Sequence, residues 1–316
     1  MKEKCCFKTS IGGQALIEGI MMKGPSKTSV AVRTPDGSID VKTENNKTKL
    51  KTLRKIPFIR GIFNMIFSLT EGYKYLNYSI EKSGLELEDE EPSKFEKWLT
   101  KVFGDNLTKV VVVIGSVLGV ALSLFLFMFI PSFITSLLSK LFKEGYTDFL
   151  KTLTEGIIKM IIFLCYMASV SLMEDIKRVF MYHGAEHKSI HCYEKGLDLT
   201  VENVRECSRF HKRCGTSFIF LVLLISIVLF SVLNITWGNI LFRVLIKTLC
   251  LPLIAGIAFE IIKIAGRFDN FITDIISAPG LYLQRLTTKE PDDSMIEVAI
   301  EALKEVLPEK GEDDKW

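Results

Sequence analysis

The chain has 316 residues, of which 48% are hydrophobic and 22 are phenylalanine, and its mean hydropathy is +0.27. This composition excludes a disordered chain, a collagen-like chain and a small disulfide scaffold. The net charge of +3, from 40 basic and 37 acidic residues, is too small to indicate a nucleic-acid partner. Because charges are absent from long stretches and dense elsewhere, we expect a mainly α-helical, polytopic membrane protein with soluble segments.

Residues 1–55 predict a segment that contains β structure. Residues 30–33 and 39–42 alternate in polarity, and Pro35-Asp36-Gly37 lies between them, which is typical of a β-hairpin. The preceding residues 11–25 contain four glycines but lack the Gly-Lys-Ser/Thr ending of a phosphate loop. This pattern favours a tightly packed edge strand, with a ligand-binding loop as the alternative.

Residues 56–80 predict an amphipathic helix that lies in the membrane interface. From Ile56 to Leu69 the sequence is apolar except for Arg60 and Asn64, which is too short and too interrupted to span a bilayer. The following residues 81–108 are rich in acidic side chains and predict a solvated linker.

Residues 109–265 predict a transmembrane domain of four helices. The run from Val110 to Phe133 holds 24 residues without a charge, and such a helix is about 36 Å long, enough to cross the hydrocarbon core. A second uncharged run extends from Gly215 to Phe242. Two weaker segments carry a few charges, mostly near their ends, where long basic side chains reach the headgroups. We expect the spans at about 110–134, 155–174, 217–236 and 241–264.

Charge placement predicts the orientation of these spans. Four spans put the N-terminal region, the loop 174–216 and the segment 266–316 on one side, and that loop is rich in Lys and Arg. Basic residues near a membrane remain in the cytoplasm, so we expect both termini to be cytoplasmic, with membrane lipid as a partner. Residues 1–6 lack the apolar core and cleavage site of a signal peptide.

The segment 266–316 predicts a second amphipathic helix, beginning after Glu290-Pro291. Its apolar residues recur at helical spacing, so the helix docks on another element, and we expect the β segment to be that element. Just before this segment, Glu260 lies in the last expected span. An ionisable group at that depth usually forms an ion pair or belongs to a functional site. We expect an ion pair, with Lys263 or Arg267 as the partner.

The loop 174–216 carries the strongest chemical signal. All four histidines of the chain lie between residues 183 and 211, and Cys192, Cys207 and Cys214 lie in the same loop. Histidine and cysteine together on a polar loop are the usual ligands of a transition metal, and zinc is the expected ion.

We expect residues 174–194 to continue the second span as a helix, because they contain one glycine and no proline. At about 100° per residue, one side of this helix collects its three histidines and two of its glutamates, while Cys192 faces away. The residues on that side are His183, Glu186, His187, His191 and Glu194. The string from His183 to His187 matches the H-x-x-E-H pattern of inverted zinc peptidases. In that pattern the histidines bind zinc, and Glu186 is the expected catalytic base that takes a proton from water.

One helix cannot complete this metal site. His183 and His191 are about 12 Å apart along the axis, whereas an imidazole places a metal about 6 Å from its own Cα. An expected helical return from Val201 offers Cys207, His211 and Cys214 on a single face. The predicted metal ligands are therefore drawn from His183, His187, His191, His211 and Cys214. The alternative is a polar seam of hydrogen bonds between the two helices.

Several strings of the chain resemble the YqhQ family of bacterial membrane proteins. They are residues 12–15, 22–25, 60–61, 182–194, 213–218 and 279–288. The resemblance covers about residues 10–305 and implies a metal-dependent enzyme of the bacterial inner membrane, without indicating a reaction. Family members usually have proline where this chain has Lys212. The loss of this proline loosens the turn before the third span, but His211 and Cys214 are still present.

Two functions follow from these patterns. The first is a membrane metal-dependent hydrolase that acts on a membrane-borne peptide or lipid. The second is a non-catalytic scaffold or accessory factor in membrane-protein biogenesis, in which a structural metal or the polar seam holds two helices together. An ion transporter is less favoured, because the expected spans contain few polar groups.

Overall fold

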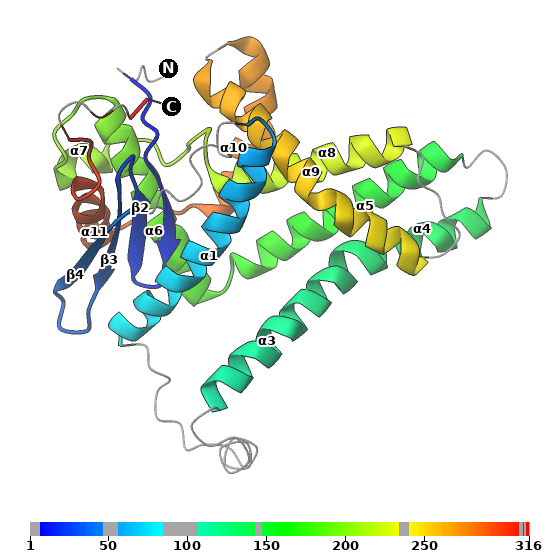
Figure 1. Ribbon diagram of the computed structural model, residues 1–316, viewed down its shortest axis with the longest axis horizontal. Coiled ribbons are helices and arrows are strands. Elements are labelled where there is room, and N and C mark those ends of the chain that lie inside the picture. The colour runs from blue at the N-terminus through cyan, green and yellow to red at the C-terminus, as the bar shows by residue number, and fades with distance from the viewer. Residues whose placement is uncertain are drawn as a thin grey trace. The chain divides into compact units, whose positions relative to one another are not determined.

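The computed structural model describes residues 7–46, 56–84, 107–142, 147–233, 240–268, 270–309, 312, 314 and 315. The chain divides into two compact units (Figure 1). Unit 1 comprises Met1–Gly84, Met167–Ile225 and Leu251–Trp316, and unit 2 comprises Leu85–Tyr166 and Ser226–Cys250. The described chain is mainly helical, as the sequence predicts, with one small sheet.

The sheet in unit 1 is antiparallel, with the strand order β1-β2-β3-β4. Its strands are β1 (Gly12–Leu16), β2 (Gly19–Lys23), β3 (Lys27–Arg33) and β4 (Ile39–Asn45). The hairpin predicted around Asp36 is confirmed, because β3 and β4 pair from Lys27 with Asn45 to Arg33 with Ile39. The glycine-rich segment forms two paired strands instead of the single edge strand that we expected, with β1 at the edge.

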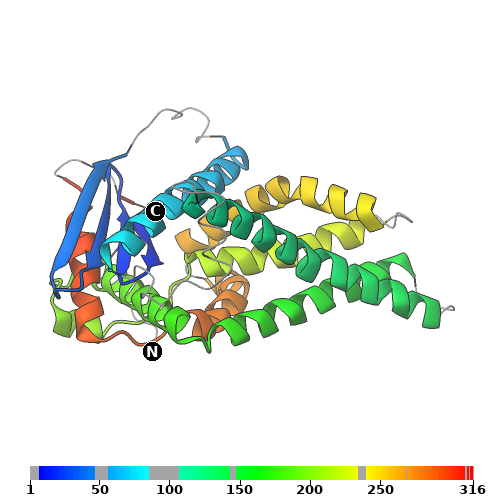
Figure 2. The same ribbon diagram turned by 90° about the horizontal axis from the view of Figure 1, so that it is seen from below.

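Both faces of this sheet are covered by helices. Successive residues of a strand point to opposite faces of the sheet. In this sheet apolar side chains point to each of the two faces. One face packs against α6 (Glu174–Glu194) and α11 (Asp293–Lys304), and the other packs against α1 (Ile59–Lys82). Figure 2 shows α1 on one side of the sheet and α11 and α6 on the other. The side chains toward α6 and α11 include Ile20, Met22 and Ala31, and those toward α1 include Met21, Val30 and Val32.

The C-terminal amphipathic helix is confirmed as α11. Its N-terminus is capped by Asp292, whose side chain accepts a hydrogen bond of 3.0 Å from the Met295 amide. The predicted apolar stripe is fully buried, with Met295 and Leu303 both 0% exposed. Burial of each such side chain contributes about 1.5 to 3 kcal/mol. The expected pairing of this helix with the β segment is also confirmed, since α11 packs on β2 and β3.

The helix expected to continue from the second span is broken. Helix α5 (Asp148–Val170) ends at Val170, and α6 begins at Glu174. Met173, directly before α6, has an extended backbone conformation. The Ser171 hydroxyl donates a hydrogen bond of 2.7 Å to the Ala168 carbonyl, and such a bond competes with helix continuation. Acidic residues in the first turn of α6 favour a new N-terminus there.

The expected helical return from Val201 is also wrong in part. Helix α7 (Val201–Arg205) is short, and residues 206–214 run without a helix to α8 (Gly215–Leu233). A further helix, α10 (Phe271–Thr287), was not anticipated, although Asn270 and Thr273 form a capping box at its start.

Among the described residues, four helices are long and apolar enough to cross a membrane, as predicted. They are Ile114–Leu141, Asp148–Val170, Gly215–Leu233 and Val244–Arg267. These helices indicate a membrane protein. Most of the expected acidic linker, residues 85–106, and the expected turn within residues 234–239 lie outside the described residues.

The first of these segments contains a change of helix type. Helix α3 (Leu107–Leu124) is followed by the π-helical turn η3 (Phe125–Phe129) and then by α4 (Ile130–Leu141). Pro131 lies in the first turn of α4. Because proline has no backbone N–H and its ring clashes with the preceding turn, it disturbs the regular hydrogen-bond ladder at this point.

The N-terminal end of α1 is held against α9 (Ile240–Arg267) within unit 1. Glu260 accepts a hydrogen bond of 2.7 Å from Nε of Arg60 and one of 3.1 Å from the Phe58 amide. Arg60 is a partner of Glu260 that the sequence does not reveal, because the two residues are 200 positions apart and no local pattern connects them.

Candidate metal centre

The candidate site is built around α6, which packs against β1, α7 and α11. The middle of this helix, from Gly184 to Ile190, is buried. Gly184 is required by a close approach, because a Cβ atom there would overlap the carbonyl oxygen of Lys289, in the segment that follows α10. All three histidines of α6, together with Glu186 and Glu194, are therefore held on a rigid and largely enclosed element.

Within the part of the chain that the structure describes, two groups of side chains have a geometry that could hold a metal ion, and His183, His187 and Cys214 form the first. Each offers one ligand atom, and these atoms lie within 4.8 Å of one another. Nε2 of His183 is 3.2 Å from Sγ of Cys214, and the rings of His183 and His187 have centroids 4.4 Å apart. Ligand atoms on one tetrahedral zinc ion lie about 3.3 to 3.8 Å apart. The group therefore needs to close by only about 1 Å to hold an ion.

The histidines of α6 are oriented by backbone carbonyls. Nδ1 of His183 is 2.8 Å from the Thr287 carbonyl, and Nδ1 of His187 is 2.6 Å from the Arg209 carbonyl. A carbonyl oxygen only accepts hydrogen bonds, so Nδ1 of each ring carries a proton and Nε2 is the atom that is able to bind a metal. A hydrogen bond from the second ring nitrogen to a carbonyl is the usual support of a metal-bound histidine.

Charge is concentrated in this group. Burial by itself raises the pKa of the Cys214 thiol, but His183 and His187 beside it hold the pKa well below its usual range. Burial also lowers the pKa of His183, yet the charge of Cys214 and the hydrogen bond to it raise that pKa to about 9. These opposite shifts favour a thiolate on Cys214 beside a protonated His183. A thiolate is also the form in which cysteine binds zinc.

Glu186 lies one residue before His187 and is connected to the sheet. It is 6% exposed, and its Oε1 accepts a hydrogen bond of 3.0 Å from the Gly13 amide on β1. Burial raises the pKa of this carboxyl group, while the neighbouring histidines oppose the shift. A carboxyl group whose pKa is raised by burial and which lies next to two histidines is suited to accept and donate protons.

His191, Glu194 and His211 form the second group, in which the ligand atoms also lie within 4.8 Å of one another. A charge is already present there, because Arg213 forms an ion pair with Glu194 and lies 3.0 Å from Nε2 of His211. Glu194 also accepts a hydrogen bond of 2.9 Å from the Thr9 amide. A guanidinium group at this position neutralises Glu194 and repels a second cation. We therefore interpret this group as an ion-pair network beside the candidate metal site formed by the first group.

The structure separates the residues that the sequence placed together. His183, His187 and Cys214 converge, and His191 and His211 lie next to them in the second group. Cys207 instead joins Cys192 in the apolar core between α6, α7 and α11. The face expected for Cys207 assumed a helix through residues 206–214, and the chain is irregular there.

Sequence reasoning missed the residues that position these ligands. Gln284 on α10 is 0% exposed and bonds the His211 amide at 2.8 Å and the His211 carbonyl at 2.7 Å. The carbonyls of Thr287 and Arg209, the Gly13 amide and the Arg213 guanidinium complete the surroundings. Backbone groups carry no signal in the sequence. The polar residues of the string 279–288 were a signal that α10 contributes to the site.

The donor set fits zinc. Two imidazole nitrogens and one thiolate are preferred ligands of this ion, and three protein ligands leave a fourth position open. Calcium and magnesium prefer oxygen ligands, which this first group does not provide.

Residues 56–309 match the protein family described as "Protein of unknown function (DUF1385)". The chain is also 38% identical over 299 residues to the protein named "Uncharacterized protein YqhQ" of Bacillus subtilis (strain 168), covering 94% of this chain and 92% of that protein. No solved structure matches the chain. Neither of the two descriptions assigns a metal or a reaction. Because both matches cover most of the sequence, the chain belongs to the DUF1385 family of proteins of unknown function.

Proposed function

We propose that this protein is a membrane-embedded, zinc-dependent hydrolase with its metal at His183, His187 and Cys214. The proposal rests on one observation: three ligand atoms from α6 and the following loop lie within 4.8 Å of one another. The carbonyl contacts of both imidazoles support it, since they leave each Nε2 directed at the group.

The surrounding residues have separate roles in this proposal. When bound, zinc supplies Lewis acidity at a carbonyl or phosphoryl group of the substrate. Glu186 takes a proton from the attacking water and returns it to the leaving group, and the Gly13 amide holds its carboxylate in place. Gln284 positions the loop that carries Cys214 through its bonds to His211.

The membrane suggests where the substrate comes from. Cys214 immediately precedes the candidate span Gly215–Leu233, so the site lies at the end of an apolar helix. The two ends of the described chain meet in unit 1, where Thr9 pairs with Lys315. This supports a topology with both termini on one side, and the basic residues of 174–216 favour the cytoplasmic side of a bacterial inner membrane. The substrate in this proposal is a membrane-borne peptide or lipid.

Metal analysis combined with a Glu186→Gln variant tests the hydrolase. The full chain, purified in detergent, should contain one zinc per chain. Reconstituted in phosphatidylglycerol and phosphatidylethanolamine vesicles, it should cleave those lipids or a dye-quenched single-span peptide. Glu186→Gln should keep the zinc and lose activity by about 100-fold or more. Glu202→Gln, an exposed glutamate on α7, is the matched control and should behave like the wild type. A metal-free protein with full activity would refute the proposal.

Burial of the site favours a second function. His187 is 1% exposed and Glu186 is 6% exposed, which is typical of a structural site that holds helices together. In this case zinc would join α6 to the start of α8 in a non-catalytic scaffold for membrane-protein biogenesis. His183→Ala would then lower both stability and complementation of a strain that lacks the protein. Glu186→Gln would have no effect on complementation, whereas the hydrolase requires that this variant fail.

A further inference from the structure

Unit 2 contains a group of buried charges outside the metal centre. Glu155 and Lys159 lie on α5, and Lys247 lies on α9, all within candidate membrane spans. Their exposed fractions are 4%, 9% and 5%. Charges in such segments are costly and usually mark a functional site.

The carboxylate of Glu155 is already engaged. Its Oε1 accepts hydrogen bonds from Nζ of Lys247 and, at 2.9 Å, from Oγ of Ser132 on α4. Lys159 lies one turn after Glu155 but, among the residues that the structure describes, its ammonium group donates no hydrogen bond and forms no ion pair. One carboxylate therefore faces two ammonium groups, and the described cluster carries an excess positive charge.

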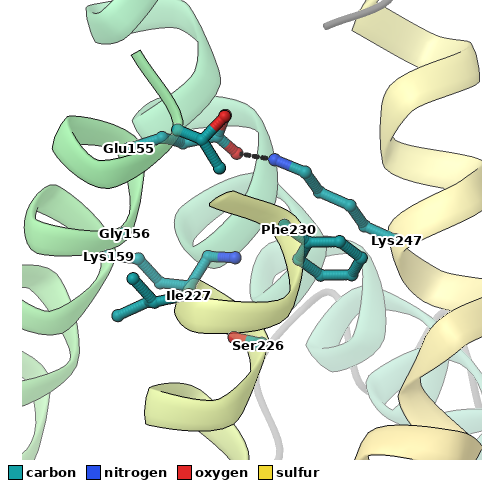
Figure 3. A pocket seen from close by; sticks show the side chains of 8 residues that line it. Glu155, Gly156, Lys159, Ser226, Ile227, Phe230 and Lys247 are labelled. Carbon is teal, nitrogen blue, oxygen red and sulfur yellow. Dashed lines mark hydrogen bonds and ion pairs between the residues drawn. The ribbon is translucent and has the colours of Figure 1, made fainter. Parts of the chain in front are cut away.

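The three charged side chains line a common cavity. Figure 3 shows Glu155, Lys159 and Lys247 directed into the space between α5 and α9, with Phe230 beside them. Thr152, Gly156, Ser226 and Ile227 line the rest. The cavity has a volume of about 10 Å³ for a water-sized sphere. This is room for about one water molecule or one monatomic ion.

We propose that this cavity binds one monatomic anion of the halide class between Lys159 and Lys247. An isolated ammonium group in a low-dielectric interior costs several kcal/mol, and a bound anion offsets this cost by neutralising the excess charge. The size of the cavity favours chloride or bromide over sulfate, phosphate and carboxylates. Glu155 occupies one side of Lys247 and leaves Lys159 as the main ligand.

Binding of radiolabelled chloride tests the site directly. The full chain, purified in detergent with gluconate as the only other anion, should bind one chloride per chain in a saturable manner. Bromide should compete, and sulfate should not. Lys159→Met should weaken binding by about 10- to 100-fold, the effect of losing one charged hydrogen bond. Lys151→Met is the matched control on the same helix, because this lysine is more exposed and pairs with Asp148. Its affinity should equal that of the wild type.

Glu155→Gln provides a second test that does not remove a ligand. This variant abolishes the competing negative charge but preserves the shape of the side chain, so chloride should bind at least as tightly as in the wild type. If Lys159→Met fails to fold, the chloride affinity of Glu155→Gln, compared with that of the wild type, tests the proposal. The proposal is overturned if the wild type shows no saturable chloride binding, because water would then fill the cavity beside a neutral Lys159. Equal affinities of Lys159→Met and Lys151→Met, or a loss of binding in Glu155→Gln, would overturn it as well.

Discussion

Replacement of Gln284 by alanine tests whether α10 positions the loop that carries His211 and Cys214. The Gln284 side chain is 0% exposed. Its Oε1 accepts a hydrogen bond of 2.8 Å from the His211 amide, and its Nε2 donates bonds of 2.7 Å to the His211 carbonyl and 3.2 Å to Oγ of Ser217. Alanine removes all three bonds and leaves both backbone groups of His211 unpaired.

The magnitude of this effect follows from the unpaired groups. Each buried polar group without a partner costs about 1 to 3 kcal/mol, so the two backbone groups of His211 cost about 2 to 6 kcal/mol. For a unit of 150 to 250 residues, about 1 kcal/mol corresponds to about 2 to 4 °C in Tm. We therefore expect the Tm of Gln284→Ala to be about 4 to 24 °C below that of the wild type. We also expect weaker zinc binding, because the loop before Cys214 loses its anchor.

Thermal unfolding of the full chain in detergent micelles, followed by circular dichroism, measures this change. Arg285→Ala is the matched control, because the next residue on α10 is exposed and its replacement should change stability by less than about 0.5 kcal/mol. Gln284→Glu keeps the acceptor for the His211 amide but loses the two donated bonds, so its Tm should lie between those of the wild type and Gln284→Ala. Equal Tm values for Gln284→Ala and Arg285→Ala would refute the reasoning.

Two further pairs of variants test the surroundings of the metal centre. Gly13→Ala should lower the free energy of unfolding by about 1 to 3 kcal/mol in chemical denaturation, because the new Cβ atom would lie 2.9 Å from Cγ of Glu186. Gly12→Ala meets no atom within 4 Å and should be neutral, so equal losses in both variants would contradict the close packing of β1 on α6. Cys214→Ala should lose zinc to a competing chelator at least about tenfold more readily than the wild type. Cys192→Ala should keep the wild-type affinity, because Cys192 lies in the apolar core, and loss of zinc from this variant would contradict the assignment of ligands.

The elements with a regular pattern were predictable from the sequence. A helix repeats every 3.6 residues and a strand every two, so local periodicity revealed the stripe of α11 and the β3–β4 hairpin. The four spans followed from apolar length alone. The same periodicity placed His183 and His187 on one side of α6, where the structure has them. In each case the physical cause acts within one element.

The assembly of the candidate metal centre depended on tertiary structure. The irregular path of residues 206–214 decides whether His211 or Cys214 lies beside His183. An irregular segment has no repeating pattern in its sequence from which the positions of its side chains could be predicted. The Thr287 and Arg209 carbonyls that orient the imidazoles belong to the backbone, which is chemically alike at nearly every position. Contacts between residues far apart in the chain arise only when whole elements pack, and the local sequence contains no record of that packing.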